Sequence, residues 1–189
     1  MRRGFHHIGL ATWDYDRCVD FYTRVVGFEI AWQDVIEAPD GTVLMKHVFF
    51  DTGDGTCISF MAPRPAMGAP ESWEADHSKL VGLMPGTYHF SFLLETLEEL
   101  EEKQKDLESK GVACTPVVDH GFCDSVYFRD PDGLMLEFSV QTRDFNDDDR
   151  KLTHKVQPTF ELFKTDPELA RRFAKAVGVS EEVLAEGTL

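Results

Sequence analysis

The sequence predicts an α+β fold, built from two tandem βαβββ modules and ending in a short C-terminal helical appendage. The main observation is an internal repeat, in which HVFFDTGDGTCISF at 47–60 matches SVYFRDPDGLMLEF at 125–138 without a gap. A second match precedes it, between FHHIGLAT at 5–12 and YHFSFLLE at 88–95. Each of these early strands is followed by a segment with helical spacing that ends at a glycine. The order of elements is therefore the same in both halves of the chain.

Each copy of the longer repeat predicts a β-hairpin. β-branched and aromatic residues flank an Asp-Gly pair, which ends at Gly55 in the first copy and at Gly133 in the second. Glycine readily adopts the positive φ angles that tight hairpin turns require. Both modules therefore end in a pair of antiparallel strands.

The helix of each module is indicated by apolar residues at i, i+3, i+4 and i+7 spacing. The first helix lies within 13–28 and ends at Gly27, and the second lies within 96–112 and ends at Gly111. The residues expected on the buried faces are Cys18, Phe21, Tyr22 and Val25 in the first helix, and Leu97, Leu100, Gln104 and Leu107 in the second.

The modules occupy residues 4–62 and 86–140, joined by a Pro- and Gly-rich linker at 63–85. We expect residues 1–140 to form one domain and 141–189 a partly helical extension. In that extension, Asp166 and the proline after it have the pattern of a helix N-cap and first helical residue. The apolar stripe of this helix can pack either on the parent domain or on a second subunit.

Composition excludes several classes of partner. The formal net charge of −15 disfavours binding to nucleic acids or anionic membranes. The N-terminal residues do not have the pattern of a signal peptide, and no apolar run has the length of a membrane span, so we expect a cytoplasmic protein. The four cysteines have no metal-binding or disulfide spacing, and we expect reduced thiols.

The repeat also predicts a site. If the two modules pair their sheets into one half-barrel, His7 and His89 face each other from equivalent first strands. The equivalent last-strand positions, Ser59 and Glu137, complete the ring around them. Two imidazoles and one carboxylate are the ligands of the facial triad that binds non-haem Fe(II) or a similar divalent ion. We therefore expect a half-barrel metal site held by His7, His89 and Glu137.

These motifs together resemble the vicinal oxygen chelate superfamily, which includes glyoxalase I, extradiol dioxygenases and fosfomycin- and bleomycin-resistance proteins. The resemblance covers about residues 4–140, and rests on HHIGLAT, FYTRVVGF, YHFSF and VYFRDPDGLMLEF in that order. It implies metal ligation by His7, His89 and Glu137. Members similar to glyoxalase I have a fourth ligand, a carboxylate, where this chain has Ser59, so the resemblance to that reaction is weakened.

The resemblance to extradiol enzymes implies further roles near the metal. Tyr127, ten residues before Glu137, has the position of the family's acid tyrosine, and His120 is a second candidate acid or base. Structural roles in the core or in a surface loop remain alternatives for both. Three further histidines, His6, His47 and His77, are weaker candidates for ligation or proton transfer. We expect His6 to point to the opposite face from His7.

Three functions follow as hypotheses. We favour an Fe(II) extradiol-type dioxygenase acting on a small catechol-like substrate. The alternatives are a glyoxalase-like lyase, isomerase or epimerase with a non-redox divalent metal, and a non-catalytic ligand-binding protein of the resistance type. Fe(II) is the favoured ion, with Mn, Zn, Ni or Co as alternatives. A small molecule is the expected partner, and the metal site can form within one chain or across a homodimer.

Overall fold

The computed structural model describes residues 4–151, 163 and 165–186. By their internal contacts the residues form two compact units, each described by itself below. The first comprises Met1–Ala75 with Asp130–Leu134, and the second Asp76–Arg129 with Met135–Leu189. None of the described helices combines the length and the apolar character of a membrane-spanning segment.

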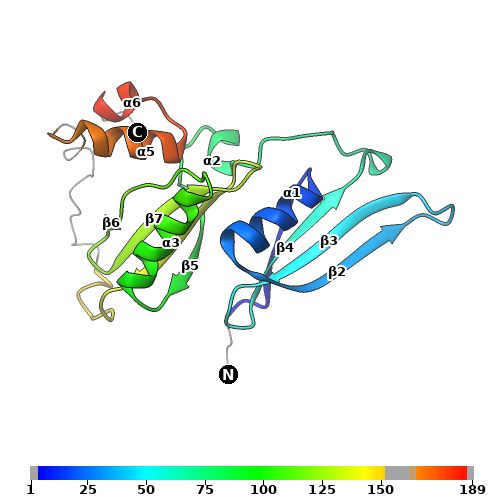
Figure 1. Ribbon diagram of the computed structural model, residues 1–189, viewed down its shortest axis with the longest axis horizontal. Helices are drawn as coiled ribbons and strands as arrows, with labels where there is room; N and C mark the ends of the chain where they lie inside the picture. Colours follow the sequence, from blue (N-terminus) through cyan, green and yellow to red (C-terminus); the bar gives the residue numbers. More distant parts are fainter. Residues whose placement is uncertain (1–3, 152–162, 164, 187–189) are drawn as a thin grey trace. The chain divides into compact units, whose positions relative to one another are not determined.

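The first unit contains a four-stranded sheet with one long helical segment (Figure 1). Its strands are in the order β1-β4-β3-β2, with β1 parallel to β4 and the other pairs antiparallel. Its elements are β1 (His7–Ala11), α1 (Tyr15–Asp20), the π-helix η1 (Phe21–Val26), β2 (Glu29–Glu37), β3 (Val43–Asp51), β4 (Cys57–Pro63) and the 3-10 helix η2 (Pro65–Met67).

The second unit repeats this topology and adds C-terminal helices. Its strands are in the order β5-β8-β7-β6, with β5 parallel to β8. Its elements are α2 (His77–Leu80), β5 (Phe90–Leu94), α3 (Leu97–Ser109), β6 (Val118–Asp119), β7 (Cys123–Arg129), β8 (Met135–Gln141), α5 (Pro167–Val177) and α6 (Glu181–Glu186). Both sheets are open. The predicted α+β fold of tandem βαβββ modules is confirmed.

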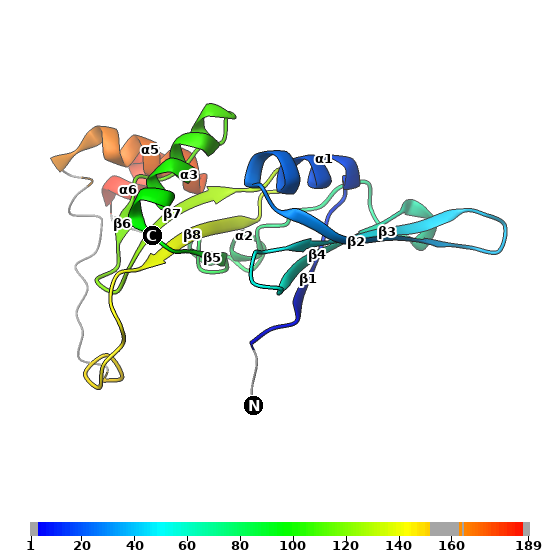
Figure 2. The same cartoon turned by 60° about the horizontal axis from the view of Figure 1, so that its bottom comes forward.

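Each module buries one face of its sheet beneath its own helix (Figure 2). In the first unit, the ring of Tyr22 stacks on Phe50 at 5.2 Å and tilts against Phe60 at 4.6 Å. The predicted buried face of this helix is confirmed, and the helix ends at Gly27 with φ 92°. The opposite face of the second sheet carries Ser91, Tyr127 and Glu137, which are neighbours in the strand register.

The helix of the second module differs from prediction at one end. Leu100 and Leu107 are fully buried as expected, but Leu97 is 43% exposed. Leu97 is the first residue of α3 and is open to solvent at the helix end. The side chain of Gln104 donates a hydrogen bond to the carbonyl of Thr115 instead of packing in an apolar core.

The strand β6 is much shorter than its counterpart β2. It has 2 residues, whereas β2 has 9. Pro116 lies just before it and has no backbone N–H to donate to a neighbouring strand. The second sheet therefore has three strands of full length and one short edge.

The C-terminal helices pack on the second unit of their own chain. Asp166 caps α5 by accepting hydrogen bonds from the N–H groups of Glu168 and Leu169, as its position before Pro167 predicts. The helix contacts β7, and its side chains form an apolar cluster with α6. The residues of this cluster are Phe163, Leu169, Ala170, Phe173, Ala174, Val179 and Leu184.

The turn between β7 and β8 carries a buried carboxylate that belongs to the first unit. Asp130 is 6% exposed and accepts hydrogen bonds from the N–H groups of Asp132 and Leu134 and from the hydroxyl of Tyr22. Burial raises the pKa of Asp130 to about 6, although the N–H group of Leu134 opposes this shift.

This shift predicts a pH dependence of stability. The folded protein holds the Asp130 proton to a higher pH than the unfolded chain, so the free energy of unfolding contributed by this group falls as pH rises from about 4 to 6. The variant Asp130→Asn keeps the shape but cannot ionise. We expect its stability relative to wild type to increase by on the order of 2 kcal/mol between pH 4 and pH 7. Urea unfolding across this range measures it, and parallel pH profiles for the two proteins would contradict it.

Candidate metal centre

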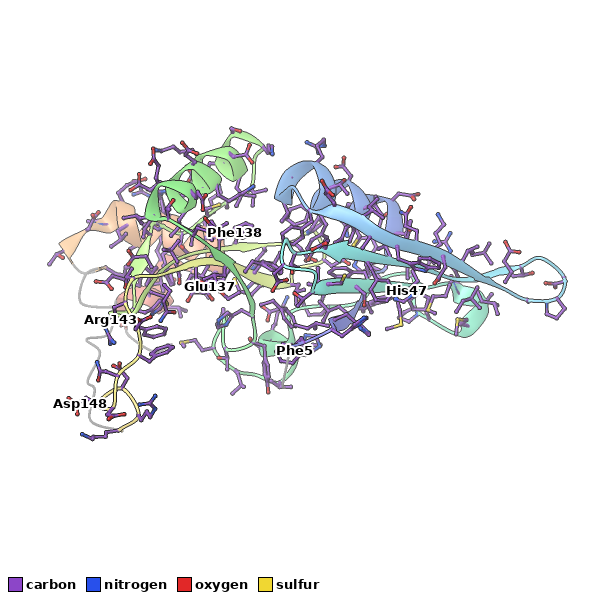
Figure 3. The ribbon with its side chains drawn as sticks, turned by 90° about the horizontal axis from the view of Figure 1, so that it is seen from below. Phe5, His47, Glu137, Phe138, Arg143 and Asp148 are labelled. Atoms are coloured by element: carbon purple, nitrogen blue, oxygen red, sulfur yellow. The ribbon has the colours of Figure 1, made fainter. Side chains whose placement is uncertain are left out.

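Glu137 lies on the open face of the second sheet, at its centre. On β8 it pairs with Ser91 of β5 on one side and with Tyr127 of β7 on the other. Side chains alternate between the faces of a strand. Phe138, its neighbour in Figure 3, therefore faces the helix side, where its ring stacks on Phe128 at 5.4 Å. The register thus places a carboxylate where its side chain is only 6% exposed.

His89 contacts this carboxylate directly. Its Nε2 lies 3.0 Å from Oε2 of Glu137, and its side chain is one-third exposed. His89 comes just before β5, whose first residue is Phe90. The pair therefore joins the start of one strand to the middle of its parallel neighbour.

A backbone carbonyl fixes the orientation of the His89 ring. Nδ1 lies 2.6 Å from the carbonyl oxygen of Gly86, which can only accept a hydrogen bond, so Nδ1 carries a proton. Gly86 has a φ of 84°, which favours glycine at this turn. In the neutral ring, Nε2 is then the nitrogen with a lone pair. Histidine metal ligands typically have this arrangement, with one nitrogen bonded to a carbonyl and the other directed at the ion.

The electrostatics of the pair suit a cation. The hydrogen bond to Glu137 raises the pKa of His89 more than partial burial lowers it. Burial opposes ionisation of Glu137, but hydrogen bonds from His89, Ser125 and Ser91 lower its pKa overall. Nε2 and the carboxylate thus face each other at 3.0 Å, as two ligands that share a metal ion would. The donor set of the pair fits a divalent ion.

Tyr127 and His120 lie beside this pair. The Tyr127 hydroxyl is 2.9 Å from Nε2 of His120, and the Tyr127 ring meets the His89 ring edge-on at 5.6 Å. Burial and then the charge of Glu137 raise the pKa of Tyr127, so its phenol stays protonated near neutral pH. Four of the five predicted site residues thus form one cluster in the second unit.

Serine hydroxyls around the carboxylate were not singled out from the sequence. Ser125 is fully buried and, with Ser91, donates to Glu137. The hydroxyls of Ser91 and Ser139 are 2.8 Å apart. Ser125 lies two residues before Tyr127 on β7, and Ser139 lies two residues after Glu137 on β8. Because side chains alternate along a strand, this spacing places them on the same face and could have identified them.

His7, the fifth predicted residue, belongs to the first unit and is exposed on β1. Its Nδ1 lies 2.8 Å from Nδ1 of His6, and its ring meets Phe49 edge-on at 5.2 Å. The expectation that His6 points away from His7 is wrong. His6 lies just before β1, so strand alternation does not direct its side chain.

The other candidate residues have different surroundings. Ser59 is buried and its hydroxyl donates to the carbonyl of Ile8 at 3.3 Å, which suits a structural role. His47 is labelled in Figure 3. Its Nδ1 is 3.7 Å from Asp34, and its ring packs on Phe49 at 4.5 Å. His77 is the exposed first residue of α2.

No group of three or more His, Cys, Asp or Glu side chains that could hold an ion is found among residues 4–151, 163 and 165–186. The second unit offers the pair of His89 and Glu137. A third protein ligand has to come from outside this pair, and His7 is the residue predicted for it.

The family of the chain is established by comparison with known proteins. Residues 4–138 match the family model of the glyoxalase/bleomycin resistance protein/dioxygenase superfamily. The match includes both modules and covers more than half of the sequence. The chain therefore belongs to this superfamily, which is the vicinal oxygen chelate superfamily. Membership implies a divalent metal and a small-molecule ligand.

Among curated proteins, the chain is similar to biphenyl-2,3-diol 1,2-dioxygenase 2 of Rhodococcus globerulus. The two are 31% identical over 103 residues, which are 52% of this chain and 52% of the relative. The chain spans about half the length of the curated relatives it matches.

Solved structures share the fold. A glyoxylase/bleomycin resistance protein/dioxygenase domain from Frankia sp. EAN1pec has a TM-score of 0.57 at 21% identity, over 75% of this chain and 99% of that chain. The fosfomycin resistance protein FosX of Listeria monocytogenes has a TM-score of 0.52 at 22% identity, over 75% of this chain and 96% of that chain. These similarities concern the fold alone.

If Glu137 is a metal ligand, Glu137→Gln should bind divalent metal more weakly by more than about 100-fold. Changes to groups that merely orient ligands already cost roughly 10–100-fold. Competition with a chromogenic chelator measures the affinity. The matched control is Glu101→Gln, on the outer surface of α3, which should bind metal like wild type. Equal affinities for wild type and Glu137→Gln would exclude the carboxylate as a ligand.

The proton on His89 predicts a pH dependence of metal binding. Because the hydrogen bond to Glu137 raises the pKa of His89, protons and metal ions compete for Nε2. Affinity should therefore rise with pH by up to about tenfold per unit and level off above the pKa of His89. Isothermal titrations in buffers of different ionisation enthalpy measure the released proton. An affinity that is independent of pH, with no proton release, would contradict this.

Proposed function

We propose that the chain is an Fe(II)-dependent, extradiol-type dioxygenase that acts on a small catechol-like substrate. The proposal combines the site geometry with the similarity to biphenyl-2,3-diol 1,2-dioxygenases at 31–32% identity over about half the chain. Those relatives, by name, act on a vicinal diol of an aromatic ring.

The observation that carries the proposal is the contact between His120 and Tyr127 beside the ligand pair. A hydrogen-bonded imidazole and phenol, 2.9 Å apart, form an acid-base pair. A histidine with a purely structural role does not require a hydrogen-bonded tyrosine. Its presence next to His89 and Glu137 favours an enzyme over a protein that only binds a ligand.

In the proposed site, His89 and Glu137 hold the ion, with His7 as third ligand. Bound Fe(II) would supply a Lewis acid and a template for the reaction of the diol with dioxygen. The carbonyl of Gly86 keeps the His89 ring oriented, and Ser91 and Ser125 keep the carboxylate oriented. The ligands are thus held in place before the substrate binds.

Proton transfer falls to His120 and Tyr127. The neutral form of His120 can accept a proton from a diol hydroxyl, and the half-buried Tyr127 phenol can donate a hydrogen bond to a substrate oxygen. Because the pKa of Tyr127 is raised, the phenol keeps its proton through the pH range in which the diol loses one. The two groups therefore have complementary roles.

The first unit lacks the carboxylate that glyoxalase-type chemistry needs. Ser59 stands at the position equivalent to Glu137, and its hydroxyl is bonded to the carbonyl of Ile8. A hydroxyl is a weak ligand and a poor base at neutral pH. This favours an oxygenase over a glyoxalase-like lyase or isomerase.

Oxygen consumption tests the proposal. Protein prepared without oxygen and loaded with Fe(II) should consume O2 and yield a coloured ring-fission product from biphenyl-2,3-diol or catechol. We expect Tyr127→Phe and His120→Ala to lower kcat by about 10²–10⁴-fold, the usual contribution of a general acid or base. Both variants should retain the metal.

Two controls make the outcome specific. Ser59→Ala should leave both metal content and kcat unchanged, and Glu137→Gln should lose both. If wild type binds metal but turns over substrates without O2, the chain is a lyase or isomerase and not a dioxygenase. If it binds diols but converts them with none of the metals, the chain is a ligand-binding protein.

A further inference from the structure

Arg129, the last residue of β7, connects the C-terminal helix to the segment before β5. Its Nη2 donates to the carbonyl of Val177 at 2.6 Å, at the end of α5. Its Nη1 donates to the carboxylate of Asp76 at 2.8 Å, just before α2. Asp76 is 3% exposed, so this ion pair is shielded from solvent on the carboxylate side.

Arg129 lies against the C-terminal end of α5. Gly178 follows the helix with a φ of 75°, and a side chain there would lie 3.5 Å from Nε of Arg129. The helix end also carries partial negative charge, which attracts a guanidinium. The contact therefore depends on the ordinary C-terminal geometry of α5.

Asp76 connects Arg129 to α2. Besides accepting from Arg129, its carboxylate accepts a hydrogen bond from the N–H group of Lys79 and caps the helix. A helix of one turn has little stability of its own. Its position therefore depends on the cap and on what holds the cap in place.

Ser78, within α2, makes two hydrogen bonds to the loop that precedes His89. Its carbonyl accepts from the N–H group of Leu83 at 2.8 Å, and its hydroxyl accepts from the N–H group of Tyr88 at 3.0 Å. Ser78 is fully buried. Between these two contacts lies Gly86, whose carbonyl orients the ring of His89. The two ends of this loop are thus anchored on a single residue.

We propose that Arg129 is a positioning residue that couples the C-terminal helix α5 to the orientation of His89. The connection runs through Arg129, Asp76 and Ser78, which we call the brace. This inference rests on the proposed function, in which His89 binds the metal. The extension that follows the second module then acts on the site although it supplies no ligand from its described residues.

The brace can be weakened without removing a ligand or an acid-base residue. Arg129→Gln breaks the ion pair, and Arg129→Lys keeps the charge but not both hydrogen bonds. Asp76→Asn keeps a good helix cap but removes the charge that Arg129 contacts. Ser78→Ala removes the hydroxyl that holds Tyr88. The matched control is Arg172→Gln, which breaks the exposed ion pair of α5 with Glu108 at 2.9 Å and does not touch the brace.

Binding of Co(II) and its visible absorption spectrum report on the loaded site. We expect Arg129→Gln and Ser78→Ala to weaken Co(II) binding by about tenfold, at the low end of the range for groups that orient a ligand. Their spectra should shift, and Arg129→Lys and Asp76→Asn should give intermediate effects. The double variant Arg129→Gln/Ser78→Ala should bind Co(II) about as weakly as Ser78→Ala alone, because both residues act along one connection. Arg172→Gln should bind within about twofold of wild type.

The metal-free protein gives a second, independent readout. Two-bond 15N correlations of the His89 ring should show a proton on Nδ1 in wild type and a mixture of ring states in Arg129→Gln and Ser78→Ala. If these variants lower Tm but leave the His89 ring signals and Co(II) affinity unchanged, Arg129 has a merely structural role and the proposal fails. If wild type binds no Co(II), the proposed function fails, and the ring signals alone decide whether the brace positions His89.

Discussion

The site depends on one contact, between the imidazole of His89, which is one-third exposed, and the buried carboxylate of Glu137. A carboxylate that is 6% exposed is costly unless a cation or several donors compensate it. Here donors compensate it, since Nε2 of His89 lies 3.0 Å away and the hydroxyls of Ser91 and Ser125 bond to it. The arrangement holds negative charge at a fixed point on the open face of a sheet. A metal ion bound by both groups would replace the direct contact between Nε2 of His89 and Glu137.

The repeat explains why only one half of the chain carries such a carboxylate. Ser59 and Glu137 occupy equivalent positions, opposite Phe49 and Tyr127 on the adjacent strands. In the first module these two positions hold the aromatic ring of Phe49 and the hydroxyl of Ser59, which donates to the carbonyl of Ile8 on β1. In the second they hold an acid and a phenol that can exchange protons with His120. The same backbone therefore carries a hydroxyl in one module and a carboxylate in the other, and this asymmetry supports the proposed dioxygenase over a glyoxalase-like enzyme.

Much of this could be predicted because it depends on periodic patterns. The hairpin register that places Tyr127 opposite Glu137 follows from the Asp-Gly turn, and the buried face of the first helix follows from its apolar spacing. The carbonyl of Gly86 and the brace could not be predicted, since hydrogen bonds between distant loops leave no periodic signal. The side-chain direction of His6 was missed for a related reason, because the residue lies outside the regular strand. Sequence patterns thus predicted the candidate ligands, whereas the groups that orient His89 and Glu137 required the structure.

Anomalous diffraction from crystals of the protein loaded with Mn(II) or Fe(II) tests the central claim most directly. The account predicts one ion bound by Nε2 of His89 and by the carboxylate of Glu137, at about 2.0–2.2 Å from each. The imidazole of His7, from the same chain or from a second copy, should complete the set. An ion bound elsewhere, with His89 and Glu137 still in direct hydrogen-bonded contact, would contradict the account.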